Sequence, residues 1–254
     1  MNNGKESQKP SWEQLCSLAG FIVEFLGAFL NAQQVKYWLS HKTELKNKLR
    51  EVFSIVDEYA SIREEWQKFY KNHFGWDVDF NQVIIPQMPT NGKWRLLFIP
   101  RGMTSDIAYN TAGRHFRCHK GGIDSLNKHF FKNARDTKNH YAIWVRDEVV
   151  PDKEYLGKSV EKIDSEGILG ITLFERIIFE IKYFTEVGNH LDVEDSIKES
   201  RTCCSGSRGG GDEPIPYVFW EGKGDDAFDG CFLVYGDFID RKNKKDGIRS
   251  AVSL

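Results

Sequence analysis

The sequence has little of what usually identifies a chemical class. Its five cysteines among 254 residues follow no regular spacing, so neither a disulfide framework nor a paired zinc motif is indicated. Lys and Arg (35) nearly balance Asp and Glu (37), and the net charge of −2 excludes the strong global positive field of a non-specific nucleic-acid binder. The longest apolar stretch, residues 15–30, contains Glu24 and is shorter than the roughly 20 apolar residues of a spanning helix. We therefore expect no transmembrane segment and, without a secretory leader pattern, a cytoplasmic protein.

Catalytic motifs are also missing. The run 205–207 (Ser-Gly-Ser) lacks the Gly-x-Ser-x-Gly pattern of a nucleophile elbow, and the triple glycine 209–211 lacks the Lys-Ser/Thr of a phosphate loop. His115, Cys118 and His119 come closest to a metal signature, but adjacent ligands rarely reach one ion. We expect no enzymatic activity, no catalytic residue, no metal and no cofactor; a hydrolase or metalloenzyme is the third-ranked alternative.

The N-terminal part of the chain is predicted to be helical. Residues 1–10 are polar and are interpreted as a flexible tail. Residues 11–72 contain no proline and carry apolar side chains at helical spacing, with Ser11 as an N-cap, which predicts two or three helices. We interpret this region as a scaffold or oligomerisation region, and we assign Phe21 and Phe25 to its core.

Residues 73–254 are predicted to form an α+β domain. The helix 172–187 is the clearest element, because Thr172 and Glu175 make a capping box and Gly188 supplies a stop. Short runs of β-branched or aromatic residues, bounded by Pro, Gly or Asn, predict strands. A short helix is expected between two of these strands. The predicted strands are 82–85, 94–100, 141–145, 217–220, 231–238 and 248–252, and the predicted short helix is 125–131.

Aromatic residues are concentrated near the C-terminus. The chain has 7 Trp, 9 Tyr and 18 Phe, and seven of these lie in the 22 residues 217–238 together with four Asp and four Gly. Core strands favour Val, Ile and Leu in alternation, whereas aromatics mixed with small polar residues are typical of a paratope. A twisted, aromatic-rich sheet with ordinary turns remains the structural alternative for this segment.

Six segments of the C-terminal half carry a resemblance to known proteins: 141–147 (YAIWVRD), 170–176 (GITLFER), 182–192 (KYFTEVGNHLD), 204–208 (CSGSR), 216–220 (PYVFW) and 248–250 (IRS). In these segments the chain resembles a family of uncharacterised bacterial proteins whose tails vary within a fixed frame. The order of features from residue 165 onward is also similar to the C-type-lectin-like fold of the variable proteins of diversity-generating retroelements.

This resemblance implies a fold and a function. It implies a helical N-terminal region followed by a C-type-lectin-like (formylglycine-generating-enzyme-type) domain with short, irregular strands and a variable tail at about 205–254. It implies a non-enzymatic protein that binds a protein ligand through a surface diversified by adenine-directed mutagenesis of asparagine-type codons, with Trp220 as framework. The positions carried over as the variable surface are Tyr217, Phe219, Asp225, Asp226, Phe228, Phe232, Tyr235, Gly236 and Asp237.

A basic cluster near the C-terminus supports a second hypothesis. Arg241, Lys242, Lys244 and Lys245 could contact phosphate, although Asp237, Asp240 and Asp246 dilute their charge. A nucleic-acid-associated protein is therefore the alternative function. Calcium is not expected, because the acidic residues of the tail form no ordered ligand loop.

Overall fold

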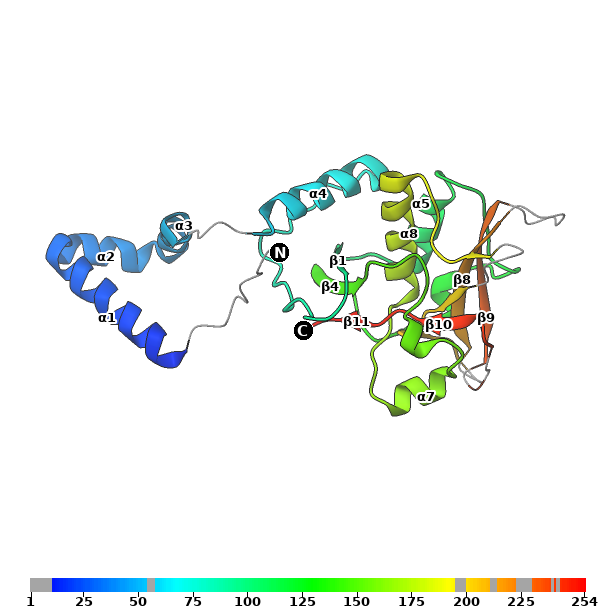
Figure 1. The fold of residues 1–254 in the computed structure, drawn as a ribbon. Helices are drawn as coiled ribbons and strands as arrows, with labels where there is room; N and C mark the ends of the chain where they lie inside the picture. Colours follow the sequence, from blue (N-terminus) through cyan, green and yellow to red (C-terminus); the bar gives the residue numbers. More distant parts are fainter. Residues whose placement is uncertain are drawn as a thin grey trace. The chain divides into compact units, whose positions relative to one another are not determined.

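The computed structural model divides the chain into two compact units, residues 1–58 and 59–254 (Figure 1). It describes residues 11–53, 58–194, 200–210, 214–222, 230–238, 240 and 243–254. The predicted tail, 1–10, therefore lies outside the described residues. We expected the boundary between the units near residue 72, and the structure places it 14 residues earlier, between 58 and 59.

The boundary differs because helix α4 (Ala60–Phe74) belongs to the C-terminal core. Its buried Trp66 donates from Nε1 to the carbonyl of Leu96 at 3.1 Å, and the Tyr70 hydroxyl donates to the carbonyl of Phe98 at 2.7 Å. Both partners lie on strand β1 (Trp94–Ile99). A helical pattern predicts α4 correctly, but the pattern alone does not say which unit the helix packs against.

The N-terminal unit consists of α1 (Trp12–Phe29), α2 (Ala32–Ser40) and α3 (Lys42–Phe53). The predicted cap at Ser11 is confirmed as a capping box with Gln14. No residue of α1 or α2 is buried, and Phe21 and Phe25 are 66% and 53% exposed, so their assignment to a core is wrong within this chain. By length and composition alone, α1 also meets the criteria for a membrane-spanning helix.

The C-terminal unit is a mixed α+β fold, as predicted. A three-stranded antiparallel sheet has the order β1, β4 (Tyr141–Arg146), β11 (Ala251–Val252). A six-stranded sheet has the order β10 (Asp246–Ile248), β6 (Arg201–Cys203), β8 (Ile215–Glu221), β9 (Cys231–Asp237), β2 (Cys118–His119), with β5 (Val193–Glu194) also paired to β8. The remaining elements are α5 (Ser105–Ala112), α6 (Leu126–His129), β3 (Lys132–Asn133), the 3₁₀ turn Lys153–Tyr155, α7 (Val160–Ser165), α8 (Leu173–Val187) and β7 (Ser207–Arg208).

The strand predicted at 82–85 is wrong. That segment has no regular structure, and the buried guanidinium of Arg63 donates to the carbonyls of Phe80 and Val83 at 2.6 and 3.0 Å. Trp144 donates from Nε1 to the carbonyl of Pro86 at 2.8 Å. Because side chains satisfy these backbone acceptors, the segment needs no strand partner to be packed against the core.

Helix α8 is central to the C-terminal unit. Its capping box and the left-handed Gly188 (φ 73°) confirm the predicted helix, and every residue from Leu173 to Lys182 is buried. In Figure 1 it runs between strands β1 and β4 and strands β8 and β9, and one hydrophobic core includes residues of all these elements. Four of its buried residues are charged: Glu175, Arg176, Glu180 and Lys182.

Buried ion pairs connect α8 to the end of the chain. The Asp192 carboxylate accepts from Arg176 Nη2 at 2.8 Å, from Arg249 Nη2 at 2.7 Å and from the Thr202 hydroxyl. Arg176 also donates to Glu180 at 2.7 Å, and Arg249 donates to the carbonyls of residues 148 and 149. Burial alone would lower the pKa of Arg176, but Asp192 and Glu180 outweigh it and raise the pKa. Every charge of this cluster is therefore compensated.

Substitution of Asp192 by Asn tests the contribution of the cluster. Asn retains the shape and tolerates the left-handed backbone at this position (φ 52°), but it leaves two buried guanidinium groups with Glu180 as their only carboxylate in the cluster. We expect Asp192→Asn to lower the free energy of unfolding by about 4 kcal/mol. The matched control is Glu64→Gln in the exposed Glu64–Lys68 pair, for which we expect a change below about 0.5 kcal/mol. Urea unfolding followed by circular dichroism measures both, and equal midpoints would contradict the prediction.

Candidate functional site

Strands β8 and β9 present two different faces. They pair in antiparallel register with Tyr217 opposite Tyr235 and Trp220 opposite Phe232. Because successive side chains of a strand alternate between faces, every second position points to the same side. The core face is formed by Val218, Trp220, Phe232 and Val234, all of which belong to or pack against the main hydrophobic core.

Phe232 was predicted to be part of the variable surface, and this prediction is wrong. Its side chain is fully buried on the core face, where its ring lies 5.8 Å from Phe116. Trp220 lies on the same face and stacks on His190, with 3.3 Å between ring centroids and 4° between ring planes. A substitution at Phe232 would therefore disturb the core and would not change a ligand contact.

The opposite side of the strand pair is a separate aromatic cluster. We define the outer face as Arg201, Tyr217, Phe219, Leu233 and Tyr235, whose apolar members form a small cluster apart from the main core. The Tyr217 ring lies 6.1 Å from Phe219 and 5.7 Å from Tyr235, in stacked geometry. The Arg201 guanidinium of β6 lies 4.6 Å from the centroid of Phe219, within the range of a cation–π contact.

Exposure differs among the side chains of the outer face. Tyr217 and Tyr235 are half-buried, whereas Phe219 is only 4% exposed. The expectation that Phe219 is an exposed contact residue is therefore wrong, although its position on the same face as the two tyrosines is consistent with the expected grouping. Phe219 supports the rings of its neighbours, and a ligand would contact those neighbours.

Five further residues were predicted to belong to the variable surface. Three of them are outside the described residues, and two lie at the end of β9. Asp225, Asp226 and Phe228 are outside the described residues. Gly236 is exposed and Asp237 is half-buried. Asp237 follows Tyr235 by two positions and so lies on the same side of β9, whereas a Cβ atom at Gly236 would lie 3.4 Å from the Phe130 ring on the other side.

The turn after β2 holds Tyr235 in place. Gly121 has a positive φ of 53°, and a Cβ atom there would lie 2.6 Å from Cδ1 of the Tyr235 ring. The His119 ring lies 6.1 Å from the same tyrosine. Only glycine fits this close approach without displacing the ring, so the edge of the outer face depends on the backbone of a distant segment.

The histidine and cysteine residues of the metal hypothesis do not form a ligand set in the described residues, where no three His, Cys, Asp or Glu side chains gather around a common point. Cys118 and His119 are neighbours on a strand and so point to opposite faces. Burial, followed by the charges of Cys231 and Glu180, raises the pKa of Cys118 to about 12, which keeps the thiol protonated. Burial also lowers the pKa of His115, whose ring packs 4.8 Å from His73.

The basic cluster is only partly visible. Arg241 and Lys242 lie outside the described residues, Lys244 is exposed and Lys245 is half-buried. The carbonyl of Lys245 accepts a hydrogen bond from the backbone of Arg201 at 3.0 Å. The described residues thus place the end of this cluster next to β6.

Comparison with protein-family models, curated proteins and solved structures gives no match.

Sequence reasoning missed Arg201, which completes the outer face. The available signal was the alternation in β6, where Arg201 and Cys203 flank the buried Thr202. That signal becomes useful only with the pairing of Cys203 to Tyr217, which brings β6 beside β8. Register between distant strands is not encoded in a local pattern.

A pair of serine substitutions on adjacent positions of β8 tests the assignment of the two faces. Tyr217→Ser changes the outer face, and we expect it to lower the free energy of unfolding by less than about 1 kcal/mol. Val218→Ser places a hydroxyl in the fully buried core face, and we expect a loss of about 3 kcal/mol. Urea unfolding measures both, and a larger loss for Tyr217→Ser than for Val218→Ser would show that the faces are assigned incorrectly.

Proposed function

We propose that this chain is a non-enzymatic binding protein that presents a diversified outer face to a protein ligand. The observation that carries the proposal is the stacked aromatic cluster on the outer face, which is separate from the main core. Tyrosine and arginine are the side chains that most often dominate binding energy at interfaces. Tyr217, Tyr235 and Arg201 provide this chemistry on one side of one sheet.

The two faces of the β8–β9 strand pair have different structural roles, and this difference supports the proposal of a diversified surface. A surface can vary between family members only where its side chains do not hold the fold. The core face and the Asp192 cluster hold the backbone of β8, because the carbonyl of Asp192 accepts from the backbone of Trp220 at 3.0 Å. The half-buried positions of the outer face, Arg201, Tyr217 and Tyr235, can therefore change while the strand positions stay the same.

The identities of the residues on each face agree with the retroelement hypothesis. Adenine-directed change of an asparagine codon gives Tyr, Phe and Cys but cannot give Trp. Tyr217, Phe219 and Tyr235 lie on the outer face, whereas Trp220 lies on the core face against His190. A capped helix, a tryptophan strand and a closing segment that contains Arg249 follow in the order expected for a C-type-lectin-like variable protein.

The gene neighbourhood tests the proposal directly. We expect a near-copy of the 3′ coding region whose differences fall at adenines, next to a reverse transcriptase gene. In that copy, the codons for Tyr217 and Tyr235 should differ, while those for Val218 and Trp220 should be the same. Sequencing the flanking DNA decides the matter, and the absence of both the copy and the transcriptase would refute the retroelement hypothesis.

The N-terminal helices support an oligomeric binding protein. We propose that α1 is covered by a second copy of the chain. The aromatic rings of Phe21, Phe25 and Phe29 follow one another along one side of this helix, and these residues are 53–70% exposed. Repeated copies would increase the apparent affinity of a weak binding face.

Phe21→Glu combined with Phe25→Glu tests this arrangement. Because charges at these positions oppose burial, we expect the double variant to be monomeric by light scattering while the unchanged protein is oligomeric. Lys36→Glu in α2 serves as a charge-changing control that should stay oligomeric. If the unchanged protein is monomeric and binds lipid vesicles, the proposal is contradicted. Such a result would favour association of α1 with a membrane.

A further inference from the structure

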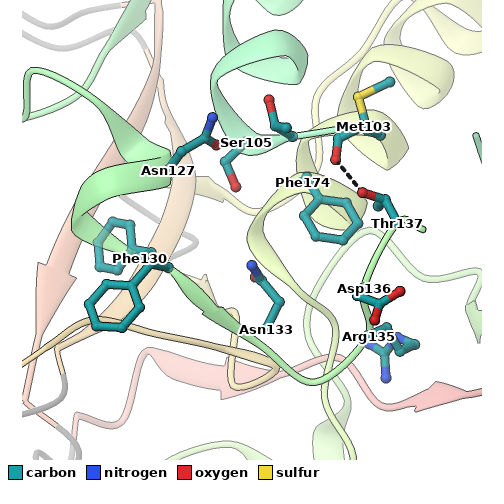
Figure 2. Close-up of a pocket in the computed structure, with 11 residues that line it drawn as sticks. Met103, Ser105, Asn127, Phe130, Asn133, Arg135, Asp136, Thr137 and Phe174 are labelled. Atoms are coloured by element: carbon teal, nitrogen blue, oxygen red, sulfur yellow. Dashed lines mark hydrogen bonds between the residues drawn. The ribbon is translucent and has the colours of Figure 1, made fainter. Parts of the chain in front are cut away.

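A polar cavity of about 340 Å³ lies in the C-terminal unit, and it shares no residue with the outer face (Figure 2). Its walls come from four segments: the start of α5, the stretch around α6, the β3 stretch through residue 137, and the start of α8. Three phenylalanines line it, of which Phe130 and Phe174 are buried and Phe131 is 56% exposed. This volume is at the lower end of the range for small-molecule sites.

Ser105 is an unused hydrogen-bonding group in this cavity. The residue is only 3% exposed, and its hydroxyl has no hydrogen-bond partner among the described residues. In Figure 2 the hydroxyl points into the space between Asn133, Phe130 and Phe174. Because Ser105 lines the cavity, its hydroxyl can complete its hydrogen bonds with a ligand bound there.

The cavity offers further donors. The Asn133 side-chain oxygen accepts from the Ser207 hydroxyl at 2.6 Å, which leaves its amide nitrogen as a donor; Figure 2 shows that nitrogen directed toward the cavity. The Asn127 side-chain oxygen accepts from the backbone of Asp106 at 3.1 Å, so its amide nitrogen is likewise a donor. The N–H groups of both amides therefore remain as donors for a ligand.

The charges near the cavity favour a singly charged anion. The positive ends of the α5 and α8 dipoles adjoin it through Ser105 and Phe174, the first and second residues of their helices. Arg135 also lines the cavity; its Nε and Nη2 donate to Glu175 at 2.7 Å, whereas its buried Nη1 has no partner among the described residues. The carboxylate of Asp136, which lines the cavity as well, is paired with Lys138 at 3.0 Å. Because Glu175 compensates the charge of Arg135, these donors suit a singly charged carboxylate better than a phosphate dianion.

We propose that this cavity binds a small organic carboxylate that has an apolar or aromatic body. The Ser105 hydroxyl and the Asn133 amide donate to the carboxylate, and the body packs against the rings of Phe130 and Phe174. The Asp106 carboxylate does not compete for these donors, because it accepts from the Ser125 hydroxyl at 2.6 Å and from the backbone of Leu126 at 2.8 Å.

Titration of the full chain with benzoate tests the proposal, with calorimetry for affinity and amide chemical shifts for location. We expect millimolar or tighter binding, with the largest shift changes at Ser105, Asn133 and Phe174. Benzylamine has the same ring with a cation in place of the carboxylate, and inorganic phosphate has the anion without a ring. Both should bind at least fivefold more weakly than benzoate.

Three variants locate the contacts. We expect Ser105→Ala to weaken benzoate binding at least fivefold and Asn133→Asp to abolish it, since a second carboxylate would repel the first. Asn110→Ala, at an exposed position on α5, should bind like the unchanged protein. Because Asn133 is exposed, its variant remains informative even if Ser105→Ala fails to fold. Equal affinity for benzylamine, shift changes elsewhere, or an Asn133→Asp variant with unchanged affinity would each overturn the proposal.

Discussion

The buried carboxylate of Asp192 is the interaction on which the C-terminal unit depends. It joins Arg176 of α8 and Arg249 near the end of the chain, and its backbone joins the loop at residue 149 to β8. Removing two guanidinium groups from water costs several kcal/mol per ion, so these arginines are tolerated only when all their partners are in place. This requirement makes the packing of α8, β6 and the last strands a single cooperative event.

That arrangement explains how the two faces of one sheet can have different roles. The β8 strand is held by its core face and by its hydrogen bond to the backbone of Asp192. The rings of the outer face form a small cluster of their own, in which Phe219 and Leu233 are buried and Tyr217 and Tyr235 are partly exposed. The cavity beside α5 is likewise separate from the Asp192 cluster, with which it shares no lining residue.

Local sequence signals predicted much of this fold. They failed where contacts with residues distant in the sequence determine the local structure. The capping box of α8 and the strands at β1 and β4 were predictable, because neighbouring residues determine them. Residues 82–85 show the same strand pattern, but Arg63, about 20 positions earlier, satisfies their backbone instead. Phe232 and Phe219 could not be placed without the register of β8 on β9, and the periodicity around Phe21 shows an apolar face without showing what covers it. The cavity was unpredictable because four separate segments form it.

The position of Arg249 also has a consequence for the order of folding. Its guanidinium donates to the carbonyls of residues 148 and 149 and to the Asp192 carboxylate, so these contacts join residues that are 57 to 101 positions apart in the sequence. Contacts between such distant residues close long loops and form slowly. Until Arg249 is in place, Asp192 lacks one of its buried partners. We therefore expect the core around α8 to close late in folding.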